Sequence, residues 1–266
     1  MRLTARLLTV FALLSICLAS PAIADFKKGM AAYEADDYAT ALKEWRPLAE
    51  QGNTDAQYGL GLIYDSGKGV PQDNAEAARW YRKAAELGLA SAQSNLGVLY
   101  ARGEGIKQDL PEAARWYRRA AEQEYAMAQF NLGVLYEKGQ GLKQNYAEAV
   151  HWYRRAAEQG DADAQLNLGL LYAKGQGVQQ SYAKAVRYYR MAAEQGDADA
   201  QSRLGLLYSN GQGAPQDLVQ AHLWLSLAAA QGDKSAAKER DLLVKKMTPV
   251  QLTQAQKLAR GWKPKK

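Results

Sequence analysis

The sequence predicts an all-α protein in which one pair of helices is repeated along the chain. Three observations support this: a period of 36 residues, apolar side chains at helical spacing within each period, and glycine or capping residues at the expected helix ends. The period is kept by Ala56, Ala92, Ala128, Ala164 and Ala200, by Gly61, Gly97, Gly133, Gly169 and Gly205, and by Tyr64, Tyr100, Tyr136, Tyr172 and Tyr208. Hydrophobic residues make up 47% and charged residues 23%, which excludes a disordered or wholly membrane-embedded chain.

Residues 1–24 have the pattern of an export signal. Arg2 and Arg6 flank the start of an apolar run over residues 7–19, and the segment SPAIA over residues 20–24 supplies an A-x-A cleavage site. The run is too short to span a bilayer comfortably. We therefore expect cleavage after Ala24 and export to the bacterial periplasm, with secretion as the alternative. Loss of the two arginines lowers the formal net charge from +6 to +4.

The only cysteine, Cys17, lies inside this signal. A lipoprotein signal needs a small residue directly before its cysteine, and Ile16 therefore argues against a lipid anchor. The mature chain then has no cysteine, so we expect no disulfide in it, although the periplasm is an oxidising compartment.

The mature chain is predicted to begin with a helix pair over residues 25–52. Gly29, Tyr38, Ala41 and Trp45 indicate this pair, with a connecting loop shorter than those that follow. Five full units come next, over residues 53–88, 89–124, 125–160, 161–196 and 197–232.

The first helix of each unit has one apolar face. In the first unit this face is formed by Ala56, Leu60 and Ile63 with Tyr64. Gly61 lies in the middle of this helix, where glycine costs up to about 1 kcal/mol relative to alanine. Because the same glycine returns in every unit, we expect it to allow a close helix–helix contact. A Gly-x-Gly loop then ends the helix.

The second helix of each unit is predicted from its start and its end. Asp73 and Glu76 have the spacing of a capping box, and the second and third units repeat the pattern. Gly88 and its equivalents end the helix, but Glu124 replaces that glycine in the second unit. We therefore expect a local distortion between the second and third units.

Residues 233–262 are predicted to form C-terminal capping helices, because the outer face of a final repeat must meet water. One helix follows Asp233, and Thr248 starts another with Pro249 at its first position. Residues 263–266 are expected to form a loose basic tail.

The segments Ala92–Ile106 and Ala113–Ala121 have the form A-x-x-x-L-G-x-x-Y-x-x-G-x-G-[VI] and A-x-x-[WY]-[YLW]-x-x-A-A. They resemble Sel1-like repeats, which are relatives of the tetratricopeptide repeat. This resemblance implies a right-handed α-solenoid with a concave face, and an adaptor that binds other proteins. Some cysteine-rich bacterial members are reported to bind penicillin-like compounds, but this chain lacks their paired cysteines.

The chain offers few residues for catalysis. His151 and His222 are its only histidines, and without cysteine they cannot form a His/Cys zinc site. No serine has a convincing base and no G-x-S-x-G motif occurs. We therefore expect no enzymatic activity, no metal and no cofactor.

Two repeated sets of side chains are expected to be structural. Tyr64 and its equivalents should pack between helices, because they recur at helical spacing. The second helices carry basic residues such as Arg82, but Glu86 lies four residues on, a spacing that suits an ion pair on a solvated face. We therefore expect no nucleic-acid binding and no stable membrane insertion, although weak contact with anionic envelope surfaces stays open.

If the first helices line the concave face, as in tetratricopeptide domains, their residues outside the core should face a partner. Those at four-residue spacing would form an apolar trough bordered by cations, and a repeated asparagine could bond a bound peptide's backbone or its own neighbours. The apolar rows could instead pack against the adjacent repeat, and the cations could be plain solvated surface. The predicted binding residues are Tyr58, Leu62, Asn95, Val98, Arg102, Phe130, Asn131, Val134, Lys138, Leu166, Asn167, Leu170 and Lys174.

Phe130 stands out in this set, because an aromatic residue there has no evident role in the core. The predicted function is a non-enzymatic scaffold or adaptor in the bacterial cell envelope that binds a peptide or protein. The alternatives are a secreted factor that binds a host protein, and a penicillin-binding or hydrolase-like envelope protein.

Overall fold

The computed structural model describes residues 24–265, and these form fourteen helices and no strand. The predicted export signal lies outside the described residues, except for Ala24. The helices are α1 (Phe26–Glu34), α2 (Tyr38–Glu50), α3 (Thr54–Ser66), α4 (Asn74–Glu86), α5 (Ala90–Arg102), α6 (Leu110–Glu122), α7 (Ala126–Lys138), α8 (Tyr146–Glu158), α9 (Ala162–Lys174), α10 (Tyr182–Gln195), α11 (Ala198–Asn210), α12 (Leu218–Ala230), α13 (Lys234–Val244) and α14 (Pro249–Gly261).

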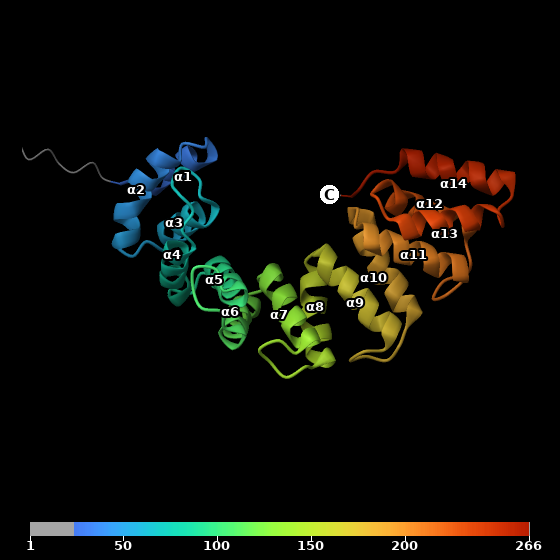
Figure 1. Cartoon of the computed structure of the whole chain (residues 1–266), viewed down its shortest axis with the longest axis horizontal. Coiled ribbons are helices and arrows are strands. Elements are labelled where there is room, and N and C mark those ends of the chain that lie inside the picture. The colour runs from blue at the N-terminus through green and yellow to red at the C-terminus, as the bar shows by residue number, and fades with distance from the viewer. Residues whose placement is uncertain (1–23, 266) are drawn as a thin grey trace, which may run out of the picture.

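The helices form one curved row. From α1 to α13 each helix packs against the next one in the chain, so that α3 with α4 forms the first of five repeats and α11 with α12 the last. Figure 1 shows the row as an arc with α1 and α2 at one end and α14 at the other. At that end α14 folds back onto α12. The predicted all-α solenoid is confirmed.

The mid-helix glycines allow the contact expected of them. A Cβ on Gly61 would lie 2.4 Å from the ring of Tyr81, and one on Gly133 would lie 2.6 Å from the ring of Tyr153. The tyrosine of the second helix thus fills the place that a side chain on the first helix would need. In the last repeat Leu225 takes the tyrosine's role opposite Gly205.

The two glycines of each loop have different roles. Gly103 has a φ of +73° and ends α5 in the left-handed conformation. Gly105 lies against the preceding repeat, because a Cβ on it would be 2.1 Å from the carbonyl carbon of Asn74 at the start of α4. The second glycine therefore allows neighbouring repeats to approach each other, a role that the sequence pattern did not reveal.

The second helices are capped, but without the predicted box. The Asp73 carboxylate accepts from the backbone N–H groups of Ala75 and Glu76. Glu76 does not reach back to Asp73; its carboxylate pairs with Arg79 and accepts from Trp80 Nε1 at 2.9 Å. In the described residues, the complete box forms at Thr248, at the start of α14.

Glu124 does not distort the junction where it replaces glycine. It adopts a φ of +61°, the left-handed conformation that glycine adopts at the equivalent position in the other repeats. Its carboxylate pairs with Arg155 and accepts from Gln129 Nε2 at 2.9 Å. The expectation of a local distortion was wrong, because these contacts hold a glutamate in the conformation that the turn requires.

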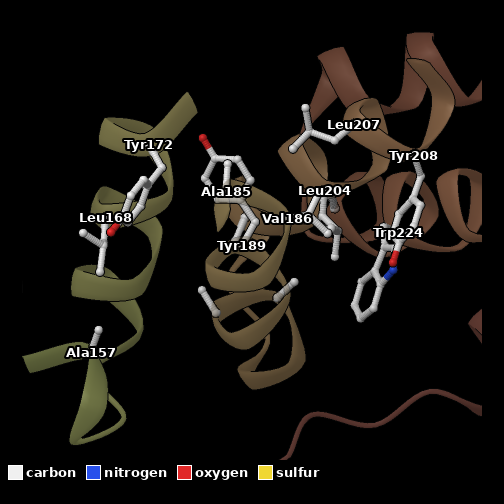
Figure 2. Close-up of a cluster of buried hydrophobic side chains, with 14 of the residues drawn as sticks. Ala157, Leu168, Tyr172, Ala185, Val186, Tyr189, Leu204, Leu207, Tyr208 and Trp224 are labelled. Atoms are coloured by element: carbon white, nitrogen blue, oxygen red, sulfur yellow. The ribbon is translucent and has the colours of Figure 1, made fainter. Parts of the chain in front are cut away.

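Buried side chains link each repeat to the next. Figure 2 shows Leu168, Tyr189, Leu204 and Trp224 in one cluster that runs from α9 through α10 and α11 to α12. No repeat therefore has a core of its own, which is the behaviour of a solenoid. Within residues 24–265, no helix combines the length and the apolar character that crossing a membrane requires.

Candidate partner-binding surface

The thirteen predicted binding residues lie on four successive first helices, α3, α5, α7 and α9. We call them the inner rows. Each of them lies three or four residues from another one in its helix, which keeps them on one face. None of them is fully buried: the cations Arg102, Lys138 and Lys174 are exposed and the other ten are half-buried. The helices therefore hold a continuous strip of partly accessible side chains.

The apolar part of the inner rows also takes part in packing. Leu62 lies against the core cluster around Tyr81, Val98 against the cluster around Tyr117, and Val134 against the next one. Each of these side chains therefore contacts the core and stays partly open to solvent.

Phe130 has a packing role that the sequence did not indicate. Its ring lies 5.8 Å from that of Tyr153, and Tyr58 has the same distance to Tyr81. Both aromatic residues come three positions before the mid-helix glycine, so they lie about one turn from it on the same helix. They therefore lie beside the tyrosine of the next helix that fills the glycine's space. The expectation that Phe130 has no role in the core was wrong.

The asparagine position lies beside these aromatic residues. Burial raises the pKa of Tyr58 and of Tyr81, and the neighbouring Asn95 amide opposes that shift at both hydroxyl groups. The Ser91 hydroxyl also faces Tyr58. Asn95 thus has polar neighbours within the protein while it stays half-buried, which agrees with the structural reading of this position.

The cations of the inner rows stand free of strong ion pairs. Arg102 lies 3.8 Å from Glu104, with 65% of its own side chain exposed. Lys138 and Lys174 form no ion pair with any carboxylate of residues 24–265. Their charge is available to an acidic group of a partner.

The basic residues of the second helices bond in an unexpected way. Arg82 Nη2 donates to the Tyr100 hydroxyl oxygen at 2.7 Å, across the junction between two repeats. The same arginine-to-tyrosine bond joins each even-numbered helix from α2 to α10 to the helix that follows it: Arg46 to Tyr64, Arg118 to Tyr136, Arg154 to Tyr172, and Arg190 to Tyr208. The predicted pair between Arg82 and Glu86 does not form, because the guanidinium reaches the next repeat instead.

A second repeated bond was also missed. Gln93 Nε2 donates to the Ala85 carbonyl oxygen at 3.0 Å, and its Oε1 accepts from Gln123 Nε2 at 2.8 Å. We call the series of such contacts the glutamine ladder; it continues from Gln159 to Gln129, from Gln195 to Gln165 and from Gln231 to Gln201. The recurrence of both glutamines every 36 residues was the signal that could have revealed it.

The two histidines lie apart from each other. His151 is exposed on α8, with its ring nearly perpendicular to that of Trp152. His222 is buried on α12 with Nδ1 3.2 Å from Ser226 Oγ, and burial lowers its pKa. Among residues 24–265, no three His, Cys, Asp or Glu side chains gather so as to hold a metal ion.

The repeat geometry can be compared with known proteins. The family model of the Sel1 repeat matches residues 54–89, 90–125, 126–161, 162–197 and 198–233. This chain belongs to the Sel1 repeat family. The match covers all five repeats of the solenoid, from α3 to the start of the C-terminal cap.

Two crystal structures resemble this Sel1 repeat protein closely. One is c5321, a protective antigen present in uropathogenic Escherichia coli strains that displays an SLR fold; it is 36% identical with a TM-score of 0.81. The alignment covers 88% of this chain but 52% of c5321, so this chain spans about half of that protein. The other, a Sel1 repeat protein from Oxalobacter formigenes, is 42% identical with a TM-score of 0.75, over 80% and 88% of the two chains.

No curated protein matches this Sel1 repeat protein. Sel1 repeat proteins generally mediate protein–protein interactions, and their fold generally serves as a non-catalytic scaffold. The family therefore agrees with the general kind of function that the sequence predicts.

Proposed function

We propose that this Sel1 repeat protein is a non-enzymatic scaffold that binds a peptide or a protein segment along its inner rows. The observation that carries the proposal is the strip itself, in which four successive first helices hold half-buried side chains in register and three of them add an exposed cation. Each repeat adds one step to the strip, so an extended partner can contact several repeats at once.

The side chains of the strip indicate the chemical character of the partner. Half-buried Leu62, Val134 and Leu170 are held by core contacts, so apolar groups of a partner can bind them without ordering the surface first. Lys138 and Lys174 attract carboxylates. The partner that fits is an extended segment with apolar anchors and acidic groups.

We also propose that residues 1–24 direct export to the periplasm. In the structure Asp25 is the N-cap of α1, and its backbone nitrogen lies 3.1 Å from Oε2 of Glu44. Glu44 is buried, and its other oxygen accepts from Lys28 Nζ at 2.6 Å. Cleavage after Ala24 would create an ammonium group at Asp25 that this carboxylate can stabilise, which supports the proposed cleavage position.

Cell fractionation with N-terminal sequencing tests the location. Mature protein that begins at Asp25 in the periplasmic fraction supports the proposal. Recovery in the culture medium favours the secreted alternative. Uncleaved protein in the cytoplasm contradicts both.

A photo-crosslinking amino acid tests the binding strip. Placed at Val134 or Leu170, it should capture a discrete partner in intact cells, whereas at Arg115 or Lys184, exposed on second helices, it should not.

Changing Arg102, Lys138 and Lys174 together to glutamate should reduce the capture. The matched control changes Lys238, Lys245 and Lys246, exposed near the C-terminus, to glutamate. Capture that is equal from both faces, or unaffected by the first triple variant, rejects the strip as the binding surface.

A further inference from the structure

Two equivalent pockets lie outside the inner rows, at junctions between repeats. The first is lined by Arg82 of α4, Tyr100 of α5 and the loop that carries Ile106 and Lys107. The second lies one repeat further along, where Arg118, Tyr136, Leu142 and Lys143 take the same places. The fold therefore presents one arrangement of side chains twice, in a fixed relation.

The pockets face away from the proposed binding strip. Tyr100 follows Val98 of the inner rows by two residues. At about 100° per residue, the two side chains leave α5 on nearly opposite sides. A ligand in these pockets and a partner on the inner rows would thus contact different surfaces.

The free polar groups of each pocket are mainly hydrogen-bond donors. The Tyr100 oxygen accepts from Arg82 Nη2 at 2.7 Å, and this bond does not use the hydroxyl hydrogen. Arg82 keeps further N–H groups, and Lys107 forms no ion pair with a carboxylate of the described chain. The same holds for Arg118, Tyr136 and Lys143, so both pockets suit a ligand group that only accepts hydrogen bonds.

The charge of each pocket is positive. Two cations face one carboxylate in each, Asp109 in the first pocket and Glu148 in the second. The Asp109 carboxylate already accepts from the backbone N–H of Glu112 at 2.9 Å, as the N-cap of α6.

The lysine is particular to these two junctions. Its position is occupied by Pro71, Gln179 and Pro215 in the other three repeats. The repeat fold thus does not require a lysine there, and the middle of the protein has an additional cation at two adjacent sites.

We propose that the two pockets together bind an acidic segment of a partner protein, with one carboxylate side chain in each. A planar carboxylate matches the guanidinium and forms charge-assisted hydrogen bonds with it. Ile106 and Leu110 in the first pocket supply an apolar wall for a neighbouring side chain of that segment. The Arg82 guanidinium lies over the Tyr100 ring, 5.8 Å from its centre, so that ring face is not open for a sugar to stack on. This favours a peptide over an acidic polysaccharide.

Fluorescein-labelled peptides test the proposal. One-pair peptides carry a single Glu-Leu pair. Two-pair peptides carry two such pairs joined by a glycine–serine linker, and the linker length is varied from peptide to peptide. Two-pair peptides should bind more tightly than one-pair peptides, with a best linker length, because the second contact is intramolecular. Changing both Lys107 and Lys143 to glutamate should weaken the best two-pair peptide by about tenfold or more, and either single change should reduce it to the affinity of a one-pair peptide.

The control variant changes Lys238 and Lys246 to glutamate, which alters the total charge equally at exposed positions outside the pockets. Equal weakening in this variant would show a general charge effect and overturn the proposal. A lack of any difference between one-pair and two-pair peptides would also overturn it. Polygalacturonate that binds where no peptide does would reject the peptide as the ligand class. Circular dichroism of all variants checks that they fold alike.

Discussion

The first helices of the second and third repeats begin differently from those of the fourth and fifth. In α9 and α11 the side chains of Asp161 and Asp197 accept from backbone N–H groups of the first turn. In α5 and α7 the equivalent residues are Leu89 and Tyr125, which supply no side-chain cap. Loss of such a cap typically costs about 1 kcal/mol. The second and third repeats therefore lack a stabilising contact that the fourth and fifth have.

The glutamine ladder is broken at the end of the first repeat, in the same N-terminal half of the solenoid. Leu87 stands where a glutamine donor stands in the following repeats, so the buried Gln57 Oε1 accepts no hydrogen bond in the described residues. Leu87 itself is 60% exposed and Met127 on α7 is 51% exposed. At the positions equivalent to Met127, α9 and α11 carry Asp163 and Asp199.

Both halves nevertheless have the same backbone arrangement. The contact of the mid-helix glycine with a tyrosine, or with Leu225 in the last repeat, and the loop-glycine contact between repeats have similar distances from one end to the other. Packing therefore sets the geometry of the solenoid, while caps and ladder bonds add stability locally. A repeat can lose these polar contacts without changing shape, because its neighbours hold it in place.

If packing sets the geometry, Gly177→Ala should lower the free energy of unfolding more than any other substitution considered below. Gly177 has a φ of +70°, and a Cβ there would lie 2.4 Å from the backbone of Tyr146 in the preceding repeat. Neither backbone can move aside, so we expect a loss of about 3 to 4 kcal/mol in the free energy of unfolding. Guanidinium unfolding followed by circular dichroism measures it.

Gly160→Ala is the matched control. Gly160 has a φ of +95°, but a Cβ there would meet nothing within 4 Å. Only the backbone conformation is penalised, at about 1 to 2 kcal/mol. Equal losses in both variants would show that the contact between repeats contributes little.

Two single substitutions should add a ladder hydrogen bond where one is missing and remove one where it is present. Leu87→Gln would give Gln57 Oε1 a donor, and we expect it to stabilise the protein by about 1 kcal/mol. Gln195→Leu would orphan Gln165 Oε1, which now accepts at 2.9 Å, and should cost about 1 to 3 kcal/mol. Hydrogen exchange should place each change at its own junction. If both substitutions destabilise the protein, the gap at Leu87 is not a missing ladder contact.

The smallest expected effect concerns pH. Burial raises the pKa of the Asp161 carboxyl above its ordinary value of 3.8. The folded state then binds the proton more tightly than the unfolded state, so this group's contribution to stability falls as the pH rises through the raised pKa. Asp161→Asn keeps an acceptor for the cap and removes this dependence, so stability should decline less from mildly acidic to neutral pH.

Asp233 provides the opposite case. Its backbone hydrogen bond from Ala236 lowers the pKa of the carboxyl, so its contribution is present above the ordinary value of 3.8 and is lost as the pH falls through the lowered pKa. Asp233→Asn should therefore reduce stability at neutral pH and leave it unchanged in strong acid. Parallel pH profiles for Asp161→Asn and Asp233→Asn would contradict this account of the caps.

Much of the fold could be predicted from residue spacing. The helix ends follow from Asp73 and Gly67, and the contact at Gly61 follows from a glycine that recurs inside a helix. The accessible positions of the first helices could also be predicted, because the side of a helix that carries Leu60 and Ile63 must face the core. These features depend on interactions within one repeat.

Contacts between repeats could not be predicted in this way. Spacing alone pairs Arg82 with Glu86 on one helix, but the stacked repeats bring the Tyr100 hydroxyl within 2.7 Å of the guanidinium. Even within one repeat, spacing did not indicate the packing partner of Phe130, which is Tyr153 on the neighbouring helix. The rotation between stacked units results from all of their side-chain contacts together, and no local pattern records it. The amino-acid sequence by itself determines the repeat unit and its period. Which side chains contact each other across a junction is decided only when the units pack.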